Sequence, residues 1–134
     1  MDSSLVNEIS REWEAEEIPD ADFLFMRVHY RFLDTDGEPM PGAFRNRPDE
    51  SGGMSVDWQK YSTPQETQAR ATEPEANIVI EFLAGAVREI PNQTVVHTPD
   101  AQRNNRAHTD IRGEKKRPVE IRARFMEIYR RVVL

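Results

Sequence analysis

The chain contains no cysteine and only three histidines among its 134 residues. The absence of cysteine excludes disulfide bonds and thiolate metal sites, and it is typical of a protein from a reducing compartment. No apolar run approaches the roughly 18 residues that a membrane-spanning helix needs. Residues 1–17 are acidic and lack the basic and then apolar pattern of a signal peptide. We therefore expect a soluble, cytoplasmic protein that has no membrane contact and no bound cofactor.

The chain has the length of one domain, and its charges are unevenly distributed. We expect a single domain over residues 1–134, with a peripheral acidic helix over 1–20 and a core over 22–134. Residues 103–134 carry ten Lys and Arg against four Asp and Glu, whereas residues 1–102 carry eight against twenty. Either the basic end contacts an acidic partner or nucleic acid, or the two regions attract each other within the fold or a dimer. The sequence leaves both possibilities open and does not give the oligomeric state.

The stretch from Phe23 to Phe32 has the alternation of a strand with two different faces. Successive side chains of a strand point to opposite sides, so every second residue shares a face. One face is apolar throughout: Leu24, Met26, Val28, Tyr30 and Phe32. The opposite face continues with Arg27, His29 and Arg31. The pattern predicts that the apolar side is buried in the core while the cationic side is available to a ligand.

Several other segments have recognisable secondary-structure patterns. Thr63, Pro64 and Glu66 form a capping box with proline at the first helical position, which predicts a short helix to about residue 70. Alternation and β-branched residues predict strands over 54–58, 77–82, 94–98 and 107–113, and residues 83–90 are expected to form a short helix. A last helix is expected from Pro118, with Ile121, Phe125, Ile128 and Val132 along one side. We therefore predict an α+β fold, a mostly antiparallel sheet of four or five strands with the C-terminal helix packed on one face.

The candidate site combines imidazole, guanidinium and carboxylate groups on the polar side of this sheet. An imidazole moves protons near neutral pH, and arginine binds phosphate or another anion through forked hydrogen bonds. Asp110 shares a strand face with His108 and is placed to orient its imidazole. If the polar faces of three strands meet, the catalytic candidates are His29, His108 and Asp110, and the ligand-binding candidates are Arg27, Arg31, Arg45, Ser55, Asp57, Asn105 and Arg106.

Simpler explanations of the same residues stay open. An antiparallel sheet with one solvated face produces this alternation without any site. His97, at the end of a strand, is typical of a histidine that makes only a structural hydrogen bond. A metal site from the histidines and Asp110 is a further alternative, but no closely spaced pair such as His-x-x-x-His supports it, and we expect none. The basic run over 114–117 either contacts nucleic-acid phosphates or forms a solvated loop.

Five short segments also resemble those of a family of small bacterial proteins of uncharacterised function. They are Arg27-Val28-His29, Ala43-Phe44-Arg45, Ser55-Val56-Asp57, Thr63-Pro64-Gln65-Glu66 and Asn105-Arg106-Ala107-His108. The resemblance covers about residues 23–113, with a small departure at Gln65. It implies a single compact domain and no particular activity.

Two functions remain open. The first is a small binding or accessory module that recognises a protein or nucleotide partner through the polar sheet face and the loops over 45–53 and 100–106. The second is a nucleotide- or nucleic-acid-processing enzyme with His29 and His108 as acid and base and Arg27 as an anion clamp. Nucleotide or nucleic acid would contact Arg27, Arg31 and the basic C-terminal region. We favour the module, because the strongest signals are structural and no nucleophile–base pair is evident.

Overall fold

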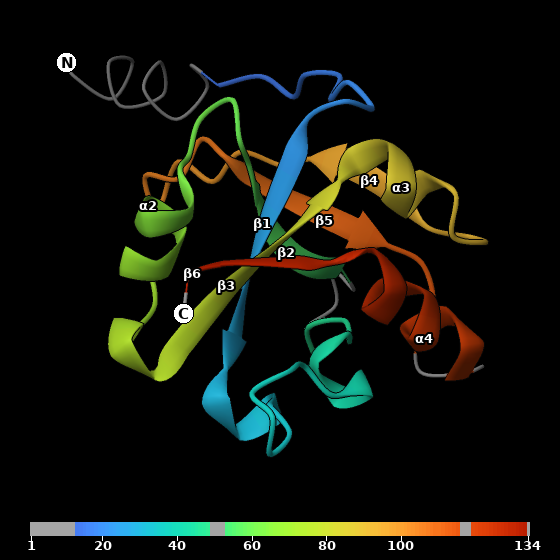
Figure 1. Ribbon diagram of the computed structural model, residues 1–134. Coiled ribbons are helices and arrows are strands. Elements are labelled where there is room, and N and C mark those ends of the chain that lie inside the picture. Colours follow the sequence, from blue (N-terminus) through green and yellow to red (C-terminus); the bar gives the residue numbers. More distant parts are fainter. Residues whose placement is uncertain (1–12, 49–52, 116–118, 134) are drawn as a thin grey trace, which may run out of the picture.

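The computed structural model describes residues 13–48, 53–115 and 119–133 (Figure 1). Six antiparallel strands form one open sheet in the order β4-β5-β2-β1-β3-β6. The strands are β1 (Phe23–His29), β2 (Gly53–Trp58), β3 (Asn77–Leu83), β4 (Thr94–His97), β5 (His108–Arg112) and β6 (Arg130–Val133). The predicted α+β class, antiparallel sheet and C-terminal helix are confirmed, but the sheet has more strands than the four or five expected.

The additional strand comes from the end of the predicted last helix. Helix α4 (Val119–Ile128) stops before Val132, and the chain continues as β6 along the outer edge of β3. Val132 continues the helical spacing from Ile128, but β-branched residues also favour an extended strand. The guanidinium of Arg130 holds the new strand to β3 through the Glu81 carboxylate. Pro118, predicted to begin the helix, lies outside the described residues.

β1 is shorter than predicted, because residues 30–32 form a 3-10 turn. The Nδ1 atom of His29 accepts the Arg31 backbone N–H at 3.1 Å and so caps this turn. Met26 and Val28 are buried as expected, but Tyr30 is 65% exposed and stacks on the His29 ring. The burial of the predicted strand's apolar face is therefore confirmed only as far as Val28.

The core lies between one face of the sheet and two helices on the same side. Helix α3 (Ala84–Arg88) contributes Ala84 and Val87, and α4 contributes Ile121 and Phe125. The opposite face carries α2 (Pro64–Ala69), which lies across β1 and β3 (Figure 1). The capping box that begins α2 is present as predicted from the sequence. Because α2 is short, it leaves part of this second face uncovered.

The predicted N-terminal helix over 1–20 is wrong where the structure describes it. Residues 13–19 form no helix, and residues 1–12 lie outside the description. Ile18 is buried in the core, and the backbone N–H of Glu16 donates to Nδ1 of His97 at 3.0 Å. The Glu16 side chain bonds to Lys60 and Tyr61, so contacts distant in sequence replace the local helix.

Candidate functional site

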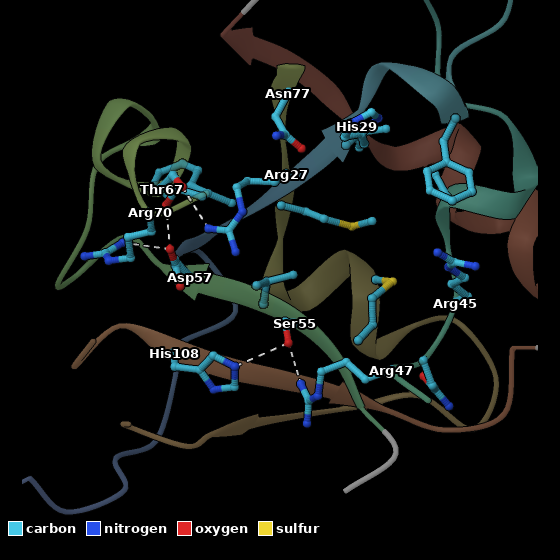
Figure 2. A pocket seen from close by; sticks show the side chains of 18 of the residues that line it. Arg27, His29, Arg45, Arg47, Ser55, Asp57, Thr67, Arg70, Asn77 and His108 are labelled. Atoms are coloured by element: carbon cyan, nitrogen blue, oxygen red, sulfur yellow. Dashed lines mark hydrogen bonds and ion pairs between the residues drawn. The ribbon is translucent and has the colours of Figure 1, made fainter. Parts of the chain in front are cut away.

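β1 and β2 are paired at one end only, and a pocket lies where they separate. Their register consists of Leu24 opposite Trp58 and Phe25 opposite Asp57. β1 remains paired with β3 along its whole length, and β2 remains paired with β5. The space between the two inner strands has a volume of about 650 Å³ (Figure 2). Small-molecule pockets commonly have volumes of ~300–1,000 Å³, so the space suits a ligand rather than a single ion.

The pocket has an apolar part and a strongly cationic part. Side chains of β1 and β2 that also reach the core, such as Met26 and Val56, form its apolar lining. Among the described residues, five arginines also line it, against one carboxylate, Asp57. The arginines are Arg27, Arg45, Arg47, Arg70 and Arg103. The pocket is therefore locally positive in a chain whose formal net charge is −6, an arrangement that attracts anions.

Both carboxylate oxygens of Asp57 have hydrogen-bond partners within the fold. Its side chain is almost completely buried and accepts from the Thr67 hydroxyl and Arg70 at 2.8 Å each, and from Nδ2 of Asn105 at 2.9 Å. These bonds connect β2 to α2 and to the loop before β5. The carboxylate thus pairs with Arg70, as a buried charge usually requires a partner of opposite charge. Its bonds also hold the pocket walls together.

Arg27 reaches into the pocket from β1 and has no ion-pair partner among the described residues (Figure 2). Its Nη1 atom donates to the backbone carbonyl of Thr67 at 2.8 Å. Burial lowers the pKa of Arg27, while the nearby Asp57 carboxylate opposes this shift. A half-buried guanidinium with one neutral acceptor retains several donors for an anion. Arg45, at the other end of the pocket, stacks 4.5 Å above the Phe32 ring and also lacks a carboxylate partner in the described chain.

Arg47 comes from the loop after Phe44 and crosses towards β5. Its Nη1 atom donates to the Ser55 hydroxyl and, at 2.8 Å, to the Asp110 carboxylate. Asp110 lies directly over Gly53, where a Cβ atom would stand 2.7 Å from Cγ of Asp110. Glycine at this position therefore gives Asp110 the room that it needs to hold Arg47.

The two predicted catalytic histidines line the pocket on opposite sides (Figure 2). His29 lies near the end of β1 and is engaged in the turn that follows. On β5, His108 contacts Thr98 through Nδ1 and, at 3.3 Å, the Ser55 hydroxyl through Nε2. The imidazoles share no hydrogen-bond partner among the described residues, and Asp110 bonds to Arg47 and Arg112 rather than to His108.

Seven of the ten predicted site residues come together around this pocket: Arg27, His29, Arg45, Ser55, Asp57, Asn105 and His108. The other three predicted residues do not line the pocket. Asp110 binds Arg47, and Arg31 is exposed over the Phe32 ring. Arg106 packs on the Tyr61 ring. Sequence reasoning did not include Arg47 and Arg70. The first lies in an irregular loop and the second caps α2, where no periodicity singles out a residue. The one sequence signal for Arg47 was its position two residues after Arg45, which was already a predicted ligand-binding residue.

The C-terminal arginines that the structure describes mostly pair with acidic residues of the same chain. Arg130 binds Glu81, Arg131 binds Glu38 at 3.1 Å, and Arg106 lies 3.7 Å from Glu16. These contacts support attraction between the two oppositely charged regions within the fold. Residues 116 and 117 of the basic run, and 49–52 of the predicted binding loop, lie outside the described chain.

Neither a metal centre nor a membrane span is found in the part of the chain that the structure describes. No group of three or more His, Asp or Glu side chains there is arranged to hold a metal ion. His97, one of the alternative ligands, bonds through its two ring nitrogens to Glu16 and Arg106 backbone groups. None of the described helices is long and apolar enough to cross a bilayer.

Comparison of the chain with protein-family models, curated proteins and solved structures gives no match. The arguments on function therefore depend on the pocket itself. Of the five segments from which a family resemblance was predicted, four supply lining residues and the fifth begins α2, which supplies Thr67; the resemblance itself stays a prediction.

Proposed function

We propose that the protein is a small binding module that holds a nucleotide or another phosphate-bearing ligand between β1 and β2. The observation that supports this most strongly is the five-arginine lining, with Arg27 and Arg45 lacking carboxylate partners in the described chain. Guanidinium groups bind phosphate oxygens through paired hydrogen bonds. Arg45 is exposed, but the half-buried Arg27 is a charge for which compensation is favourable. A bound phosphate would supply negative charge to Arg27, in the same way that Asp57 supplies it to Arg70.

The apolar part of the pocket favours a ligand with a flat ring as well as a charge. Phe25, Phe32 and the His29 ring line the same space as the arginines. Inorganic phosphate alone would leave most of a 650 Å³ pocket unfilled. Ligand pockets typically combine mainly apolar walls with a few placed polar groups, and a nucleotide uses both. We therefore expect a nucleotide to bind more tightly than phosphate alone.

The histidine pair gives less support to the alternative acid–base enzyme, because His29 and His108 contact different groups on opposite sides of the pocket. Recognition of a protein partner and a cytoplasmic location stay predictions. A protein with an acidic or phosphorylated segment would use the same arginines, and its binding would compete with the nucleotide.

The test is calorimetric titration of the full chain with adenine and guanine nucleotides and with inorganic phosphate. Arg27→Gln removes the cation that faces the pocket from β1, and a hydrogen bond to a charged group contributes ~1.5–3 kcal/mol. We expect this variant to bind nucleotide about 10- to 100-fold more weakly. The matched control is Arg124→Gln, because Arg124 lies on α4, outside the pocket, and pairs with Glu127 at 3.8 Å.

Nucleotide affinity should also fall steeply with salt for the wild-type chain, because arginine–phosphate contacts are screened. Arg27→Lys retains the charge but loses the forked geometry, so we expect an intermediate affinity. Equal binding by the Arg27→Gln and Arg124→Gln variants, or no binding of any nucleotide by the folded protein, would overturn the proposal.

A further inference from the structure

A continuous chain of hydrogen bonds runs along the wall of the pocket from the Thr98 carbonyl to Arg47. His108 Nδ1 lies 3.1 Å from the Thr98 carbonyl oxygen and 2.9 Å from its hydroxyl. On the other side of the imidazole, Nε2 lies 3.3 Å from Oγ of Ser55, which also accepts from Arg47. These contacts join β5, β2 and the loop that carries Arg45 and Arg47, here called the arginine loop, at one hydroxyl group (Figure 2).

General-base activity requires the imidazole proton on Nδ1. A carbonyl oxygen only accepts, so in this tautomer Nδ1 donates to Thr98, whose hydroxyl is able to accept as well. The lone pair of Nε2 then faces the Ser55 hydroxyl, which donates to it. Arg47 donates to the same oxygen from another direction and favours negative charge there. A hydroxyl between an oriented imidazole and a guanidinium is the arrangement of an activated nucleophile.

We propose that Ser55 is a nucleophile and His108 its general base, and that the pocket hydrolyses carboxylic esters of anionic substrates. Ser55 and His108 both line the pocket, so the hydroxyl is accessible to a ligand held by the arginines. The proposal goes beyond nucleotide binding. It rests on the proposed function in one respect only, that the arginines select a substrate with negative charge.

The reaction has two balanced steps. Ser55 Oγ forms a bond to the ester carbonyl carbon, its proton passes to Nε2 of His108, and the carbon–oxygen bond to the leaving alcohol breaks as that alcohol takes the proton. Water then attacks the acyl-enzyme and gives a proton to Nε2, the bond from Oγ to the acyl carbon breaks, and Ser55 recovers its proton from His108. The products are a carboxylic acid and an alcohol, and no oxidant or metal takes part.

The first test is labelling of the folded chain with a neutral fluorophosphonate probe, followed by peptide mass spectrometry. We expect one adduct, on Ser55, while the buried Ser62, which bonds to Thr67, serves as the internal control serine. Ser55→Ala should abolish labelling. His108→Gln should slow it at least 100-fold, since positioned bases contribute ~10²–10⁴-fold. A merely structural hydrogen-bond chain would give no covalent adduct.

The second measurement separates the nucleophile from anion recognition. We expect faster hydrolysis of mono(4-nitrophenyl) succinate than of neutral 4-nitrophenyl acetate. Arg27→Gln should reduce this preference, whereas Arg124→Gln, outside the pocket, should leave both the preference and the probe labelling unchanged. A cooperative urea unfolding transition like that of the wild type shows that the His108→Gln variant is folded. Absence of labelling in wild-type protein that binds nucleotide overturns the nucleophile and leaves the proposed function intact. Labelling of Ser55 without nucleotide binding overturns the proposed ligand and supports the nucleophile.

Discussion

Replacing Lys115 with methionine tests how a buried cation holds the arginine loop. The Lys115 side chain is 1% exposed, and its Nζ atom donates to Oδ1 of Asn46 and to the carbonyls of Ile111 and Gly113 at 2.7–2.9 Å. Burial lowers the pKa of this lysine from its ordinary value of 10.5 to about 8, although the Asp110 carboxylate opposes the shift. Asn46 precedes Arg47, so the ammonium fixes one end of the pocket wall.

The sign of the pH dependence follows from this pKa. In the unfolded chain the lysine keeps its proton to about 10.5, whereas the folded protein releases it near 8. Between these values the unfolded state binds more protons, so the free energy of unfolding rises with pH. From about pH 7 to about pH 9.5 the two pKa values correspond to a gain of about 2 kcal/mol. Lys115→Met lacks this titration, so the wild type should gain that amount relative to the variant.

The assay is urea unfolding of the wild type and the variant at several pH values in this range, with the difference between them plotted against pH. Lys60→Met is the control, because the exposed Lys60 has a pKa raised by its bond to Glu16, and its contribution is lost only above 10.5. A flat difference for Lys115→Met would show that the three oxygen acceptors keep the ammonium charged, and would refute the argument from burial.

Two further predictions concern other buried groups. Asp57→Asn should lower the free energy of unfolding by ~1–3 kcal/mol, because Arg70 loses a charged acceptor; it should also tighten nucleotide binding, and calorimetry that shows weaker binding would contradict this. Burial and the Glu38 carboxylate raise the pKa of Tyr129 to about 12, so its ultraviolet titration should lie well above the ordinary tyrosine value of 10 and its stabilisation should be lost as pH rises above 10. Tyr129→Phe should remove that high-pH phase, and an unchanged titration curve would contradict the assignment.

Local sequence signals predicted the elements whose formation depends on few distant contacts. The Thr63–Glu66 capping box satisfies helix N–H groups within four residues, so α2 forms where predicted. Alternation similarly placed β1, β2 and β5. The last helix was predicted too long because the spacing from Ile128 to Val132 fits both a helix and the start of a strand. The strand forms because the edge of β3 offers backbone hydrogen bonds to residues 130–133 and the Glu81 carboxylate to Arg130.

The site was predictable in part for the same reason. Arg27 and His29 follow from the alternation of one strand, and the structure places both along the pocket. The separation of β1 from β2 could not be predicted, because a strand pattern shows which face a residue occupies but not where pairing stops. Arg47 reaches Ser55 only because the fold brings a loop across the sheet. The Ser55–His108 contact joins residues from two strands, and spacing within either strand does not reveal it.

The partial pairing of β1 and β2 connects the fold to the charge of the pocket. From Met26 onward, the side of β1 that faces β2 has no strand partner in the described register. Guanidinium groups lie on both sides of this opening, with Arg27 from β1 and Arg47 across β2. Asp110 already compensates Arg47, so an anion bound under the proposed function would supply charge and acceptors mainly to Arg27. The opening between the strands would then also favour a negatively charged ligand.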